Sequence, residues 1–129
     1  MIFGFLANLF SCGAAEKVDL PGLVQSGALV IDVRTPGEFS SGAVKGAINI
    51  PYDEIARKIS SVESDKSRAI IVYCQSGSRS GAAKKSLERA GYTQVVNAGG
   101  FCLSPAGRFF LRIQKALSEY LRSKVRTRA

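Results

Sequence analysis

Residues 69–81 decide how this chain folds; they read Ala69-Ile70-Ile71-Val72-Tyr73-Cys74-Gln75-Ser76-Gly77-Ser78-Arg79-Ser80-Gly81. The apolar, β-branched run predicts a buried strand, and the small and polar residues after it predict a loop that leads into a helix. Cys74 would then stand at the carboxyl end of the strand, facing the loop amides and the positive end of the helix. This setting favours a thiolate and any anionic group attached to it.

Strand and helix patterns alternate on both sides of this stretch. Strands are expected at 28–33, 47–50, 69–73 and 94–97, and helices at 18–25, from 35, at 52–61, 78–90 and 107–124. The run at 28–33 is apolar almost throughout, which suits a parallel strand covered on both faces. The alternation predicts a layered α/β fold with a largely parallel sheet.

The length of 129 residues fits one domain, and no apolar run is long enough to span a bilayer. The patterns divide the chain into an amphipathic segment at 1–16, a central domain at 17–104, and a basic amphipathic helix with a tail at 105–129. We expect a cytoplasmic protein that can also associate peripherally with a membrane.

The two ends of the chain differ in character from the centre. Met1 to Phe10 is almost wholly apolar, and packing on protein is favoured there over contact with a membrane surface or a lipoprotein signal ending at Cys12. From Gly107 onward there are seven basic residues and one acidic residue. A solvated helix face is favoured over binding of anionic lipid or nucleic acid, because no aromatic-basic interleaving accompanies the charge.

Cysteine and histidine usage limits the chemistry. The three cysteines, Cys12, Cys74 and Cys102, are odd in number and widely spaced, so they do not suggest a disulfide framework. The sequence has no histidine and no CxxC pair, which argues against zinc and against any Cys-His relay. A nucleophile in this chain must therefore be activated by loop dipoles and arginine.

The loop after Cys74 is the candidate site. A cysteine at a strand end can be a small buried hydrophobe and nothing more. However, Gln75, Ser76, Gly77 and Ser78 are small or polar, so their amides can form an anion-binding nest, and Arg79 closes the loop with a fixed charge. Ligands of α/β sheets bind beyond the carboxyl ends of strands, so the catalytic interpretation is favoured.

The spacing within the loop separates two kinds of catalysis. Protein tyrosine phosphatases wrap phosphate with Cys-x5-Arg, whereas this chain has Cys-x4-Arg from Cys74 to Arg79, followed by Ser80. The shorter loop makes a smaller ring of amides. It suits a single sulfur atom on the cysteine better than a phosphoryl group.

Several motifs occur together in one order: Ile31-Asp32-Val33-Arg34-Thr35-Pro36-Gly37-Glu38-Phe39, Gly42-Ala43-Val44-Lys45-Gly46-Ala47-Ile48-Asn49-Ile50-Pro51, Val72 to Ser80, Gly91-Tyr92 and Asn97-Ala98-Gly99-Gly100. In their order and spacing, over about residues 18 to 104, the chain resembles the single-domain rhodaneses, which are thiosulfate sulfurtransferase-like proteins. The resemblance implies a three-layer α/β/α fold around a mostly parallel sheet of about five strands. The family often has His where Ala43 stands and Trp where Phe101 stands.

The resemblance also implies a mechanism. Cys74 takes sulfane sulfur from thiosulfate or a similar donor as a persulfide, and a thiol, cyanide or carrier protein removes it. The loop from Gln75 to Arg79 binds the substrate, and no cofactor, metal or nucleic acid is expected. Asp32 and Arg34 are expected to hold the architecture, Arg34 by pairing with Glu38 and Asp32 by accepting backbone hydrogen bonds.

Other functions stay open at this point. One alternative is a non-catalytic rhodanese-like binding or regulatory module, and another is a sulfur relay at a membrane surface. A phosphatase or arsenate reductase is disfavoured by the loop length. Self-association is plausible for a chain with apolar terminal helices, and Cys102 is read as an incidental loop cysteine in preference to a resolving thiol.

Overall fold

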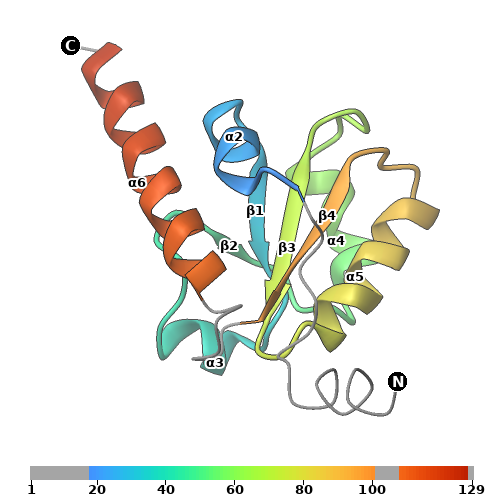
Figure 1. Ribbon diagram of the computed structural model, residues 1–129. Helices are drawn as coiled ribbons and strands as arrows, with labels where there is room; N and C mark the ends of the chain where they lie inside the picture. Colours follow the sequence, from blue (N-terminus) through green and yellow to red (C-terminus); the bar gives the residue numbers. More distant parts are fainter. Residues whose placement is uncertain (1–17, 101–107, 128–129) are drawn as a thin grey trace, which may run out of the picture.

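The computed structural model describes residues 18–100 and 108–127 of the chain (Figure 1). The segment at 1–16, Cys12, Phe101 and Cys102 lie outside the described residues, so the hypotheses about them stay predictions. None of the described helices is long and apolar enough to cross a membrane.

Strands and helices alternate along the described chain, as the sequence predicts. The order is α2 (Leu20–Gln25), β1 (Leu29–Asp32), α3 (Pro36–Ser40), β2 (Ile48–Asn49), α4 (Ile55–Val62), β3 (Ile70–Cys74), α5 (Ser78–Arg89), β4 (Val95–Gly100) and α6 (Arg108–Thr127). The described strands form one sheet in the order β2-β1-β3-β4, and every pairing is parallel. The predicted α/β fold with a central parallel sheet is confirmed, with four strands in the described residues.

Helices cover both faces of this sheet (Figure 1). Successive side chains of a strand point to opposite faces, so β3 supplies both layers. Ile70, Val72 and Cys74 face the side packed by α4 and α5, whereas Ile71 and Tyr73 face the side packed by α2 and α6. All five residues of β3 are buried, which explains why the strand reads as a continuous apolar run.

The last strand is longer than its pattern predicts. The expected strand ends at Asn97, before Gly99 and Gly100. In the structure β4 continues through Gly100. Cys74 pairs with Gly100 after a register shift between Val72 and Cys74. The two glycines therefore belong to the strand that lies beside Cys74.

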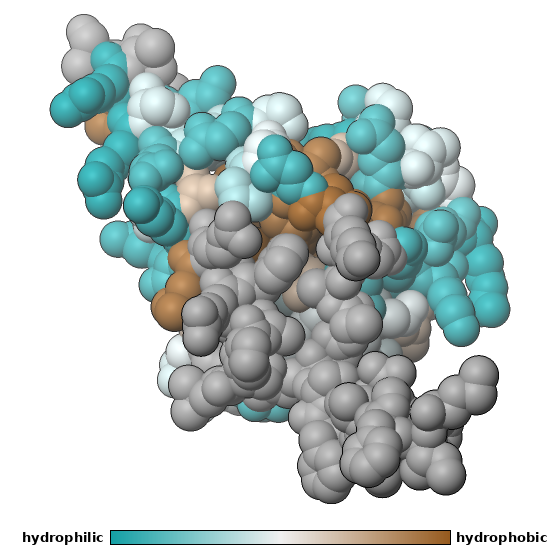
Figure 2. Space-filling model, in the orientation of Figure 1, coloured by the Kyte–Doolittle hydropathy of each residue, from teal (hydrophilic) through white to brown (hydrophobic). Residues whose placement is uncertain are grey.

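Helix α6 packs on the domain through one face and carries its charges on the other. Ile113, Ala116 and Leu117 are buried against the α2 side of the sheet. Leu111, Leu121 and Val125 stay exposed among basic residues, and hydrophilic side chains cover much of the outer side of this helix in Figure 2.

Candidate active site

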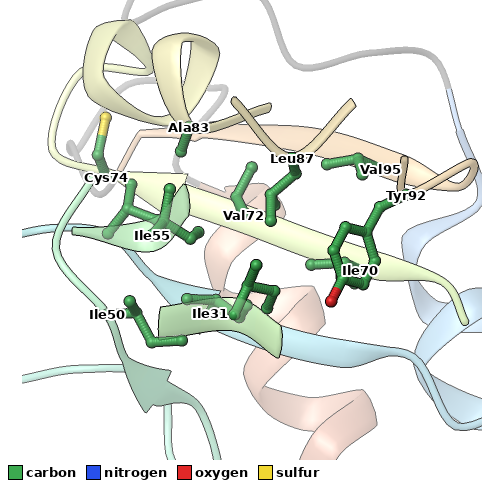
Figure 3. Packing of buried hydrophobic residues seen from close by; sticks show 12 residues of the cluster. Ile31, Ile50, Ile55, Ile70, Val72, Cys74, Ala83, Leu87, Tyr92 and Val95 are labelled. Atoms are coloured by element: carbon green, nitrogen blue, oxygen red, sulfur yellow. The ribbon is translucent and has the colours of Figure 1, made fainter. Parts of the chain in front are cut away.

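Cys74 is the last residue of β3, and its side chain is fully buried. Because side chains alternate along the strand, the thiol falls on the face packed by α5. Figure 3 shows it at one end of the apolar cluster, with the sulfur pointing toward the loop that leads into α5. Cys74 is the only cysteine among the described residues, and it forms no disulfide bond there.

The loop bends back over the sulfur at Gly77. This residue has φ of 94° and forms the N-cap of α5, a left-handed conformation that glycine adopts without steric cost. Its amide donates a hydrogen bond to Cys74 Sγ over 2.9 Å. The loop therefore aims a backbone dipole at the sulfur, as the sequence of the loop predicts for Gly77. Gln75, Ser76 and Ser78 are exposed.

The pKa of the Cys74 thiol reflects two opposing effects. Burial raises it, because a thiolate is poorly solvated there. Hydrogen bonds from the Ser80 side chain and from the amides of Ser80, Gly77 and Ser76 lower it, and they prevail, so the pKa lies below its ordinary value. The arrangement thus favours the thiolate without a histidine.

Ser80 is a site residue that the spacing from Cys74 to Arg79 does not predict. Its hydroxyl lies 3.4 Å from Cys74 Sγ, 3.0 Å from the carbonyl oxygen of Gly77 and 2.7 Å from Oδ1 of Asn97. It is fully buried in the first turn of α5. The helical period is the signal that could have found it, because Ser80 lies on the same buried face of α5 as Ala83 and Leu87.

Residues of β4 contact the loop that follows Cys74. Asn97 Nδ2 donates to the carbonyl oxygen of Gly77 over 3.2 Å, and its Oδ1 accepts the amide of Gly99 over 2.9 Å. At Gly100 the loop backbone lies so close that an added Cβ would stand 2.4 Å from the carbonyl oxygen of Gln75. Close backbone approach, not a turn, explains this glycine.

Arg79 lies in the first turn of α5 and is engaged by a carboxylate. Its Nη1 and Nη2 donate to Oε1 and Oε2 of Glu38 over 2.6 and 2.9 Å. The hydrogen bond from Arg79 is the largest effect on Glu38, and it lowers the pKa of that carboxyl to about 2. The pair therefore stays ionised at neutral pH.

Asp32 and Arg34 form a separate buried pair at the end of β1. Arg34 Nη2 donates to Asp32 Oδ2 over 2.7 Å and to the carbonyl oxygen of Gly42 over 2.7 Å. Asp32 Oδ1 also accepts the backbone amide of Arg34 over 2.9 Å. The suggested pairing of Arg34 with Glu38 is replaced by this one, because Glu38 is turned toward Arg79.

The described residues offer no metal centre: residues 18–100 and 108–127 contain no group of three His, Cys, Asp or Glu side chains placed to hold an ion. The chemistry of the site rests on sulfur, amides, a hydroxyl and the Arg79–Glu38 pair.

The rhodanese-like domain family matches residues 17–101 of the chain. The parallel sheet and the Cys74 loop belong to this matched region, and the chain is a member of the rhodanese-like domain family.

Relatives and solved structures agree with this assignment. Thiosulfate sulfurtransferase PspE of Escherichia coli is 47% identical over 70 residues, which cover 54% of this chain and 67% of that protein. A sulfurtransferase of Allochromatium vinosum is 36% identical over 72 residues, covering 56% of this chain and 65% of its own length. The chain thus spans about two thirds of the length of these curated relatives.

Among solved structures, a rhodanese with anions from E. coli is similar to this chain with a TM-score of 0.56 and 44% identity, covering 57% of this chain and 87% of that one. The human single-domain sulfurtransferase has a TM-score of 0.55 and 28% identity, covering 64% and 84%. Together the relatives support sulfurtransferase activity in general.

Proposed function

We propose that this protein transfers sulfane sulfur from thiosulfate or a similar donor to a thiophilic acceptor through a persulfide on Cys74. The observation that carries the proposal is the pair of polar groups at Cys74 Sγ: the Gly77 amide, which donates over 2.9 Å, and the Ser80 hydroxyl at 3.4 Å, which can donate when the sulfur is a thiolate. These groups stabilise the thiolate of Cys74. They also lie where they can donate hydrogen bonds to a persulfide anion on that sulfur.

The first half of the reaction balances without any added redox reagent. The Cys74 thiolate attacks the outer sulfur of thiosulfate, and a new S–S bond forms at Cys74. The S–S bond of the donor breaks, and its electron pair leaves with sulfite. Cys74 then carries a persulfide whose negative charge lies on the terminal sulfur.

The second half returns the enzyme to its starting state. A thiolate or cyanide attacks the terminal sulfur, the cysteine sulfur leaves as the thiolate, and the acceptor departs as a persulfide or thiocyanate. The loop amides stabilise the charge in both states, so no general base is needed. This fits a chain that has no histidine.

The buried state of Cys74 adds one requirement. The thiol has no exposed surface, whereas Gln75 and Ser76 directly after it are exposed. A donor reaches the sulfur only when the segments around it move apart, and a loop of small residues is suited to such movement. A non-catalytic binding module has no need for a depressed thiol pKa, so the enzyme is favoured over that alternative.

Intact-mass spectrometry after addition of thiosulfate tests the proposal. The Cys12→Ser, Cys102→Ser double variant keeps Cys74 alone and is expected to gain the mass of one sulfur atom. Cys74→Ser is expected to gain nothing and to lose sulfur transfer to cyanide, while its circular dichroism stays that of the wild type. A wild-type protein without any sulfur adduct would favour the binding module instead.

A further inference from the structure

The pairing of Arg79 is the feature that the sulfur-transfer chemistry leaves unexplained. A guanidinium near a nucleophile can bind the sulfonate oxygens of a donor through two parallel N–H groups. In this structure Nη1 and Nη2 of Arg79 both donate to the Glu38 carboxylate. An anionic sulfur donor would therefore compete with the Glu38 carboxylate for the same two N–H groups of Arg79.

Neighbouring strands bring the two residues together. Glu38 lies on α3, which follows β1, and Arg79 lies on α5, which follows β3; β1 and β3 are adjacent and parallel. The carboxyl ends of both strands meet at one edge of the sheet, so α3 and α5 begin side by side. The pairing is a consequence of the topology and joins residues 41 positions apart.

Glu38 is fixed by its own helix as well as by Arg79. The capping box of α3 holds it: its backbone amide donates to Thr35 Oγ1, and its Oε1 accepts from the hydroxyl and the amide of Thr35. The carboxylate is therefore a built-in anion held against Arg79, in the first turn of the helix that follows the Cys74 loop. The side chains of Arg79 and Glu38 are 28% and 34% exposed, so a ligand can reach the pair.

We propose that Glu38 sets the donor selectivity of the site: by occupying Arg79, it disfavours doubly charged donors such as thiosulfate relative to singly charged sulfane donors. This inference rests on the proposed sulfur transfer. Its physical basis is that a donor must displace or share the guanidinium, and that a carboxylate repels a dianion about twice as strongly as a monoanion at the same place.

The test compares two donors of different charge on the Glu38→Gln variant. Glutamine keeps the capping box, so α3 is expected to stay folded. We expect the second-order rate constant of sulfur uptake from thiosulfate to rise about fivefold, the size that an exposed ion pair of good geometry supports. With methanethiosulfonate, which carries one charge, the expected gain is about twofold.

Glu63→Gln is the matched control. Glu63 also pairs with an arginine, Arg68, but Arg68 donates to Gly27 before β1, at the opposite edge of the sheet from Cys74. Both variants change the net charge equally, so a general electrostatic effect would appear in each. We expect rates for Glu63→Gln that equal those of the wild type, and a thiosulfate gain in Glu38→Gln that shrinks as salt is added.

A second measurement does not depend on sulfur transfer. In the Cys74→Ser background, sulfite titrated by calorimetry is expected to bind about fivefold more tightly when Glu38 is also replaced by Gln. Unchanged thiosulfate rates in Glu38→Gln, equal gains for both donors, or an equal gain in Glu63→Gln would overturn the inference. If the wild type takes up no sulfur, the proposed function fails by itself, and sulfite affinity alone decides the role of Glu38.

Discussion

The hydroxyl of Ser80 has one proton and three acceptors within reach. The carbonyl oxygen of Gly77 lies at 3.0 Å, Asn97 Oδ1 at 2.7 Å and Cys74 Sγ at 3.4 Å. One proton serves one of these strongly at a time. When Cys74 is a thiol, it can donate to Ser80 while Ser80 donates to Asn97; when Cys74 is a thiolate, the hydroxyl turns to the sulfur. Ser80 is therefore placed to follow the charge on the nucleophile.

Replacing Ser80 by Ala should raise the pKa of Cys74. The folded protein then loses a donor to the thiolate, and hydrogen bonds to charged groups contribute about 1.5–3 kcal/mol, so we expect the pKa to rise by about one to two units. The thiolate fraction at neutral pH falls accordingly. Absorbance of the thiolate near the far-ultraviolet edge, titrated against pH and corrected with Cys74→Ser, measures the shift.

Ser86→Ala gives the matched control for this titration, because Ser86 lies farther along the same helix. Its titration curve should overlay that of the wild type. An unchanged pKa of Cys74 in Ser80→Ala would show that the loop amides alone set it.

At the scale of elements, β4 and the loop after β3 act as one unit. The sequence pattern predicts that this strand ends at Asn97, since consecutive glycines usually interrupt a strand pattern. Here the absence of a Cβ at Gly100 lets the strand lie against the backbone of Gln75 and Ser76. The local rule that predicts a break is overridden by a contact between segments far apart in sequence.

Gly100→Ala should displace the loop over Cys74. The new Cβ would stand 2.4 Å from the carbonyl oxygen of Gln75, and backbone cannot yield as a flexible side chain does. We expect a loss of about 1–3 kcal/mol in the free energy of unfolding, measured by urea denaturation, and a loss of sulfur uptake.

Gly37→Ala is the counterpart on α3, because nothing lies within 4 Å of its added Cβ. This substitution should leave stability unchanged or raise it slightly, since alanine restricts the unfolded chain. If Gly100→Ala behaves as Gly37→Ala does, the close approach of β4 does not shape the loop.

At the scale of the whole molecule, the candidate active site and the basic groove on α6 lie at opposite ends of the strands. Cys74 stands at the carboxyl edge, whereas α6 runs back so that the hydroxyl of Tyr120 approaches Gly27, just before β1. Beyond that point a groove is lined by Lys45, Ser118, Leu121, Arg122, Val125 and Arg126, with no acidic residue among them. A surface that docks there would leave the cysteine loop open.

The sequence favours a solvated helix face here over membrane-surface contact, and the charge and exposed apolar side chains of this groove make the alternative, an anionic bilayer, testable. Co-sedimentation with vesicles containing phosphatidylserine is expected to be sensitive to salt. Replacing Arg122 and Arg126 by Gln should weaken it about thirtyfold, at about 1 kcal/mol per basic residue. Replacing Arg57 and Arg89, which lie on α4 and α5, should not. Equal effects of both pairs would mean that net charge, not this groove, drives binding.

The sequence by itself determines the α/β class and the order of strands and helices, and it singles out Cys74 with its loop as the candidate site. These features are local: strand and helix periods, a glycine at a left-handed N-cap, and the count from Cys74 to Arg79 are written in neighbouring residues. For the same reason the Thr35 and Pro36 start of α3 is readable from the chain alone.

The tertiary structure alone decides which side chains meet. Glu38 pairs with Arg79 instead of Arg34, Asn97 holds Ser80, and Gly100 packs on the loop, because parallel strands bring their carboxyl ends to one edge. Such pairings depend on strand order and register, which no local pattern encodes. They place the hydrogen-bond donors that lower the pKa of Cys74, and on the proposed function they also set which donors Arg79 accepts.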